Sequence, residues 1–68
     1  MFTIETKLPE SVSLVGILRS EGYGQPEKTV YMWGQRGEMS EKGKVIVAAY
    51  CNANGIPWQP SDFRTQTE

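Results

Sequence analysis

The sequence GQPEKTVYMWGQRG, residues 24–37, contains the strongest local indication of secondary structure in this chain. Pro26 suits the first position of a helix, because its missing N–H would have no intrahelical partner there. Val30 and Trp33 lie three residues apart, so a helix would place both on one face. The segment therefore predicts a short helix over residues 26–35 that follows a glycine turn, buries one face and exposes a mixed polar face.

Two further helices are expected on either side of this one. Apolar residues recur at helical spacing from Val12 to Glu21, and Gly22 is placed to end such a helix. Ser40 is suited to the N-cap of a later helix, and Gly55 is placed where a helix C-terminus favours glycine. The regular apolar spacing between these two residues predicts a third helix over residues 41–54.

The two ends of the chain are expected to be less regular. Phe2 to Lys7 alternates apolar and polar residues, which predicts a short half-buried edge strand. Residues 56–63 predict an ordered, non-helical tail, in which Trp58 and Phe63 fold back onto the core. The polar residues from Arg64 onward predict a frayed end. We thus expect one domain over residues 1–64 and a flexible tail over residues 65–68.

The fold class expected from these elements is mainly α: a small helix-turn-helix domain of three helices, with a short N-terminal strand and an ordered C-terminal tail. A β-rich architecture is the alternative. Thr29 to Trp33 and Lys44 to Tyr50 are rich in β-branched and aromatic residues and could form a hairpin around the polar loop 34–43. With residues 2–7 and 12–18 they would form a small sheet, and propensity alone does not decide between the two.

Length and composition restrict the function classes. The chain has 68 residues and one cysteine, Cys51, and it has no histidine. An intrachain disulfide and a cysteine–histidine zinc site are therefore excluded. A chain this short buries only about 60% of its unfolded surface, so we expect a homodimer to add stability. Cys51 falls in the most apolar predicted helix, so we expect a buried thiol.

The distribution of apolar residues gives no indication of a membrane protein. The N-terminus lacks the basic segment and apolar run of a signal peptide. The longest apolar run, residues 45–51, is short of the roughly 20 residues that span a bilayer. A lone thiol suits a reducing compartment. We therefore expect a soluble, cytoplasmic protein with no membrane partner.

No residue pattern indicates catalysis. Without histidine the commonest general base is missing, and the serines have no catalytic motif around them. The glycine pairs at 22/24 and 34/37 do not match a phosphate-binding loop. Glu38 and Glu41 are explained by a polar loop followed by a helix start. We expect no enzymatic activity, no cofactor, no metal and no small-molecule ligand.

Positive charge gathers in the middle of the chain, although the formal net charge is −1. Residues 28–44 contain four cations and only two carboxylates, Glu38 and Glu41. The four cations are Lys28, Arg36, Lys42 and Lys44. Nucleic-acid binding depends on where charge lies more than on its sum, so these cations are candidates for phosphate contacts. An ordinary mixed-charge surface is the alternative.

The segment Val30–Gly37, followed by Met39–Lys42, resembles the phage Cro-like and related prophage repressors. In that family a glycine turn leads into a helix with valine and tryptophan, then into Arg-Gly and a short step to the next helix. The ending Asn54–Arg64 is similar to the tail after the last helix of such regulators. The resemblance covers residues 12–64. It departs from the family pattern at Tyr23 and Gln25, where a leucine and an apolar residue are usual.

This resemblance implies that residues 26–35 form the recognition helix of a helix-turn-helix, which contacts bases from the major groove. The base contacts implied in this way come from Pro26, Glu27, Lys28, Tyr31, Met32 and Gln35. The phosphate contacts implied come from Arg36, Lys42 and Lys44, and Lys28 is also within reach of phosphates. Gln35 would read adenine, Met32 a thymine methyl group and Glu27 cytosine N4.

We therefore expect a small sequence-specific transcriptional regulator of the phage type that acts by operator occupancy. It would bind double-stranded DNA as a homodimer, on half-sites about one helical turn apart. The alternative is a small phage-type protein-interaction module, an inhibitor or adaptor that does not bind DNA. The near-neutral charge and the aromatic residues favour this alternative. An exposed apolar patch that includes Trp58, Tyr23 or Met32 would indicate such a module.

Overall fold

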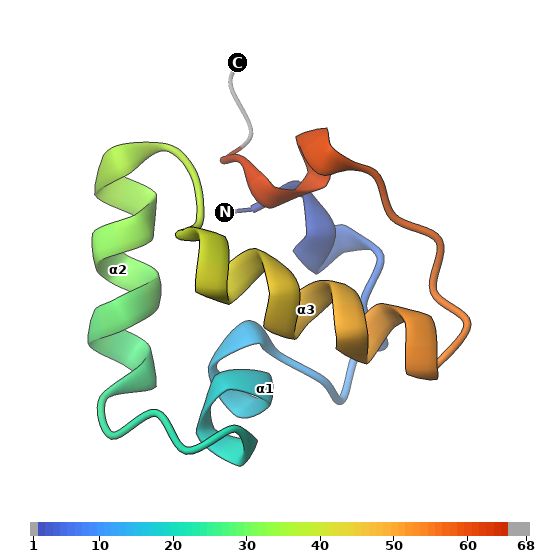
Figure 1. Cartoon of the computed structure of the whole chain (residues 1–68), viewed down its shortest axis with the longest axis horizontal. Helices are drawn as coiled ribbons and strands as arrows, with labels where there is room; N and C mark the ends of the chain where they lie inside the picture. The colour runs from blue at the N-terminus through green and yellow to red at the C-terminus, as the bar shows by residue number, and fades with distance from the viewer. Residues whose placement is uncertain (1, 66–68) are drawn as a thin grey trace.

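Three α-helices and two short 3₁₀ helices surround the core in the computed structural model, which describes residues 2–65 (Figure 1). In chain order these elements are η1 (Thr3–Thr6), α1 (Leu14–Ser20), α2 (Pro26–Arg36), α3 (Glu41–Ala53) and η2 (Pro60–Phe63). The predicted mainly α class is confirmed. The hairpin alternative is wrong, because residues 29–33 lie within α2 and residues 44–50 within α3.

Serine side chains determine where α1 and α3 begin. The Ser13 hydroxyl accepts a hydrogen bond from the Gly16 amide (3.0 Å), so α1 begins two residues later than its apolar pattern predicts. The predicted N-cap at Ser40 is confirmed, since its hydroxyl accepts from the Gly43 amide (3.2 Å). Each bond satisfies an amide that has no partner within the helix.

Glycine ends α2. Gly37 adopts the left-handed conformation with φ 86°, and its amide donates to the carbonyls of Trp33 and Gly34. A side chain at this position would strain the backbone, whereas glycine adopts it readily. The helix therefore runs one residue beyond its predicted end at Gln35 and stops.

Apolar side chains from every helix and from both ends of the chain form the core. The buried apolar residues are Phe2, Ile4, Leu8, Leu14, Ile17, Leu18, Trp33, Met39, Val47, Cys51 and Phe63. The predicted burial of Cys51 is confirmed. Burial raises the pKa of the Cys51 thiol, and the nearby negative charge of Asp62 raises it further. Cys51 is thus a core residue with little thiolate character.

The Trp33 indole holds α2 against the start of α3. Its side chain is 4% exposed, which confirms the predicted inward orientation, and Val30 packs partly buried beside the core. A Cβ atom placed on Gly43 would lie 2.3 Å from Cη2 of Trp33. Only glycine at this position of α3 lets the indole come so close.

The predicted N-terminal strand is wrong, because residues 3–6 form the 3₁₀ helix η1. The Glu5 carboxylate accepts from the Phe2 amide (2.8 Å), and the Thr6 hydroxyl donates to the Thr3 carbonyl (2.7 Å). These local side-chain bonds compete with the extended conformation. The turn still places Phe2 and Ile4 in the core.

The two ends of the chain lie side by side, as η1 and η2 do in Figure 1. The Thr3 amide donates to the Arg64 carbonyl (3.1 Å), and the Thr65 amide donates to the Gly37 carbonyl (2.9 Å). The predicted fraying is therefore wrong at Arg64 and Thr65, which pair with distant backbone. The rest of the predicted flexible tail, residues 66–68, and Met1 lie outside the described residues.

The tail folds back onto the core as predicted, but its predicted non-helical conformation is wrong at Pro60–Phe63, which form the 3₁₀ helix η2. Phe63 is buried, and the Trp58 ring lies 5.2 Å from the Phe63 ring, measured between centroids. The Trp58 indole N–H donates to Asn52 Oδ1 of α3 (2.9 Å). Among the described residues, no helix combines the length and apolar composition that crossing a bilayer requires.

A partly buried ion pair also joins the two ends. The Lys7 ammonium donates to Asp62 Oδ2 (2.7 Å), and the Gln59 amide donates to the same oxygen (3.0 Å). Asp62 is only 1% exposed. Burial alone would raise the pKa of this carboxyl, but the hydrogen bonds and the charge of Lys7 outweigh it and lower the pKa below its usual value.

Candidate nucleic-acid interface

The helix pair α1–α2 is joined by residues 21–25, and α1 packs against both α2 and α3. Figure 1 shows α2 along one edge of the molecule, with α3 crossing beside it. The helix has buried residues at Pro26 and Trp33, which lie seven residues apart and so on one face. The opposite side of α2 is left at the surface.

This outer face of α2 consists of Lys28, Tyr31, Met32 and Gln35, all of which are exposed. Lys28, Tyr31 and Gln35 follow a spacing of three and four residues, which stacks them along one line of the helix. Tyr31 is 67% exposed and Met32 53% exposed. The structure thus brings together four of the six residues that the resemblance implies for base contacts.

Pro26 does not belong to this face, and its implied base contact is wrong. The residue is buried at the first turn of α2, on the same side as Trp33. Its role is structural, because proline at this position needs no hydrogen-bond partner for a backbone amide.

Glu27 is exposed but engaged with α1. Its carboxylate accepts a hydrogen bond from the Arg19 guanidinium, and both side chains remain largely exposed. An exposed pair of this kind contributes about 1 kcal/mol at most to stability. The pair directs the Glu27 carboxylate toward α1, and no local sequence pattern links Arg19 with this residue.

The three implied phosphate contacts have different surroundings. Arg36 is exposed in the last turn of α2. Lys42 places its ammonium 5.5 Å from the centroid of the Tyr23 ring, in a cation–π contact. Lys44 instead lies 3.3 Å from Glu38 and 3.7 Å from Glu41, measured from nitrogen to carboxylate oxygen. Because these two carboxylates neutralise the positive charge of Lys44, this residue does not belong to the candidate interface.

Tyr23 was missed as a contributor to this region. Its ring packs edge-to-face on Trp33, with 6.5 Å between the ring centroids, and it also contacts the Lys42 ammonium. The turn between α1 and α2 is thereby connected to the start of α3. The contact joins residues distant in sequence, so no local pattern indicated it.

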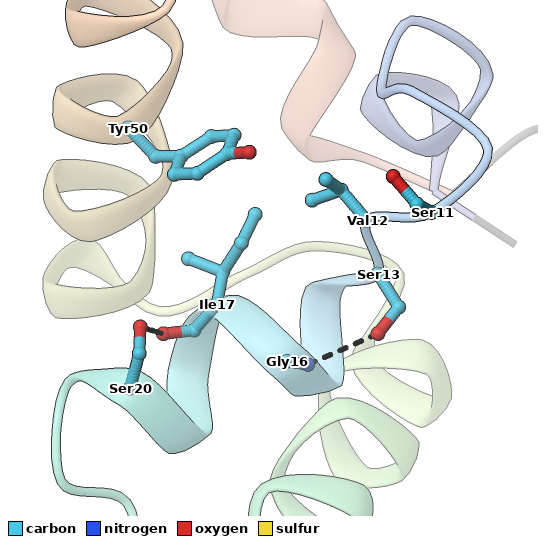
Figure 2. Close-up of a pocket in the computed structure, with 7 residues that line it drawn as sticks. All are labelled: Ser11, Val12, Ser13, Gly16, Ile17, Ser20 and Tyr50. Atoms are coloured by element: carbon cyan, nitrogen blue, oxygen red, sulfur yellow. Dashed lines mark hydrogen bonds between the residues drawn. The ribbon is translucent and has the colours of Figure 1, made fainter.

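A separate pocket lies between α1 and α3 and does not have the features of a reaction site. It has a volume of about 240 Å³, and Tyr50 extends into it from α3 (Figure 2). The Ser13 hydroxyl is occupied by the Gly16 amide, and the Ser20 hydroxyl donates to the Ile17 carbonyl (2.7 Å). Its lining contains no carboxylate or amine, and residues 2–65 contain no cluster of side chains suited to a metal ion.

The geometry thus defines a small three-helix domain whose second helix presents an exposed face. Comparisons with protein-family models, with curated proteins and with solved structures find no match. The Cro-like resemblance of residues 12–64 stays a prediction.

Proposed function

We propose that this protein is a small DNA-binding regulator that places α2 in the major groove and acts by occupying its site. The observation that carries the proposal is the outer face of α2. Lys28, Tyr31 and Gln35 are aligned and exposed there, while Pro26 and Trp33 fix the opposite side to the core. A helix is about 10–12 Å across and the major groove is about 12 Å wide, so α2 fits it.

The chemistry of this face suits base recognition. The Gln35 amide has the donor and acceptor that pair with adenine, and the Met32 thioether side chain suits the thymine methyl group. Tyr31 offers a hydroxyl to a base edge or a phosphate. Lys28, Arg36 and Lys42 supply three cations for the flanking backbone.

Charge supports the same use of α2. Its only carboxylate, Glu27, is compensated by Arg19, so Lys28 and Arg36 give the exposed helix a positive balance. As a homodimer the protein would present two such helices to half-sites about one helical turn apart. Phage-type repression by operator occupancy is the regulation that we propose.

Salt-dependent binding tests the proposal. We expect fluorescence anisotropy with a mixed-sequence duplex to show affinity that falls steeply with salt, since each phosphate contact adds about 0.9 to the slope of log K against log salt. Lys28→Ala and Arg36→Ala should each lower that slope by about 1 per subunit. Arg64→Ala is the matched control, because it removes an exposed cation from the tail. Absence of salt-sensitive binding by the unmodified protein would contradict the proposal.

A protein-interaction module is the second candidate. The neighbouring exposed side chains of Tyr31 and Met32 favour it, because aromatic residues and methionine are enriched at protein interfaces. Retention of one protein partner on immobilised chain, together with no binding to any duplex, would select this function over DNA binding.

A further inference from the structure

A long uncharged segment follows the first turns of α3. No residue from Val45 to Ser61 is charged, although charged residues make up 22% of the chain. The segment covers most of α3 and the connection to η2. Beyond its first turn α3 therefore has no charged face, whereas the outer face of a surface helix normally carries charged or polar residues.

Only one side of α3 is covered in the single chain. Val47 and Cys51 are buried, whereas Val45 on the opposite side is 68% exposed. Ala49 and Asn52 are also exposed, and their spacing from Val45 places all three on one face. The chain therefore leaves a neutral, largely apolar helix face in contact with water.

A groove lies directly beside this face. It has a volume of about 240 Å³, and its apolar walls come from Val45 and Ala48 of α3 and from Trp58, Pro60 and Phe63 of the tail. Lys44 also lines the groove, and the nearby carboxylates of Glu38 and Glu41 compensate its charge. The Trp58 wall is held in place by its hydrogen bond to Asn52 and its packing on Phe63. The groove is thus formed before any partner binds.

We propose that two copies of this chain associate through this α3–tail surface, which consists of Val45, Ala48, Ala49, Asn52, Trp58 and Pro60. A two-fold interface uses the same patch on both subunits, so the patch must be complementary to itself. Here the protruding Val45 and the groove occupy one patch, and each copy can insert Val45 beside the Trp58 of the other.

Charge and size favour a second copy as the occupant. Two uncharged surfaces meet without like-charge repulsion, and charge depletion with aromatic enrichment is typical of an interface core. DNA or a charged peptide would find no countercharge between Val45 and Ser61. The folded chain exposes 4541 Å², against about 11,000 Å² expected when unfolded, so it buries about 60% of its surface, which is usual for this length, and a second copy would add to the buried area.

The α3–tail surface can bind a second copy while the outer face of α2 stays free. Figure 1 shows α2 along one edge of the molecule and the segment after α3 along the opposite edge. Association through the α3–tail surface would leave both copies of α2 exposed. The use of the dimer in reading DNA rests on the proposed function, whereas its existence does not.

Sedimentation equilibrium of the full chain without DNA tests this proposal. We expect a mass near twice 7.6 kDa at high concentration and at least about tenfold weaker association for Val45→Lys. Lysine is a good helix former and its ammonium would point to solvent in the monomer, so the helix should persist by circular dichroism. Met32→Lys is the matched control, since it makes a similar change on the exposed face of α2, and it should associate as the unmodified chain does.

Dilution NMR of the unmodified chain gives a second measurement that does not depend on a variant. Shifts should change with dilution at Val45, Ala48, Ala49 and the Trp58 indole. A monomer at about millimolar concentration, unchanged association of Val45→Lys, or dilution shifts confined to α2 would overturn the proposal. So would a different protein that binds this surface of a monomeric chain. An intact dimer without salt-sensitive duplex binding would overturn only the proposed function.

Discussion

Gly43 and Trp33 show how one contact between residues sets the position of a whole helix. Trp33 is the large apolar side chain that α2 buries, and it packs where a Cβ on Gly43 would stand. The indole is surrounded by core residues, so it has little room to move. The sequence predicts that Trp33 points inward, but nothing near Gly43 in the sequence indicates that this glycine receives it.

We expect Gly43→Ala to destabilise the protein by about 1–3 kcal/mol, because the new methyl group overlaps the buried ring. Urea denaturation followed by circular dichroism measures this change. Gly34→Ala is the control, since a Cβ there meets nothing within 4 Å. That variant should gain up to about 1 kcal/mol from the higher helix propensity of alanine, and equal effects at the two positions would contradict the contact.

Asp62 makes stability depend on acid pH. Its pKa is lower in the folded chain than in the unfolded chain, so its contribution is complete above the unfolded pKa, near 3.8, and is lost as the pH falls through the folded value. We expect Asp62→Asn to cost about 1–3 kcal/mol at pH 7 and to flatten the loss of stability below pH 4. Urea midpoints from pH 7 to pH 2 measure both effects.

Glu10→Gln serves as the control for this measurement, because Glu10 is an exposed carboxylate in the segment before α1. It should leave the acid dependence of the unmodified protein in place. If Asp62→Asn keeps the same pH profile, the acid sensitivity comes from other groups.

The three α-helices were predictable from local features, and both 3₁₀ helices were not. Ser40, Gly37 and Gly55 mark helix ends by chemistry that acts over a few residues, so a sequence pattern is enough. Alternation at residues 2–7 was misleading, because side-chain bonds from Glu5 and Thr6 favour a turn. Within α2, helical spacing placed Trp33 inside and Lys28, Tyr31 and Gln35 outside.

The ion pair between Arg19 and Glu27 connects α1 with α2. We expect Glu27→Ala to change stability by less than about 1 kcal/mol. It should tighten binding to a mixed duplex about threefold, because it removes a negative charge from α2 and releases Arg19 for phosphate. Anisotropy titrations at low salt measure the change. Glu10→Ala removes a carboxylate away from α2, and an equal gain with that control would show that net charge alone is responsible.

Across the whole molecule, the outer face of α2 and the tail part of the α3–tail surface lie on different sides, whereas Lys42 shares one face of α3 with Val45. The polar and cationic face of α2 lies along one edge, and the uncharged α3–tail surface includes the opposite edge (Figure 1). The Lys7–Asp62 pair joins the residue after η1 to η2, and the contacts with Asn52 and Phe63 hold Trp58 beside α3. A regulator that pairs through one side and reads DNA with the other would need this separation.

The order of residues alone determines several features: the helix positions, the inward orientation of Trp33, the burial of Cys51 and the uncharged segment 45–61. Each depends on periodicity or on neighbours within a few positions. Other features depend on the tertiary structure: the burial of Pro26, the neutralisation of the Lys44 charge by two carboxylates, the Tyr23–Lys42 contact and the groove beside Val45. These features join segments that meet only after the chain has folded, and their formation depends on how side chains fill the core. Local propensity contains no information about which distant surfaces will meet.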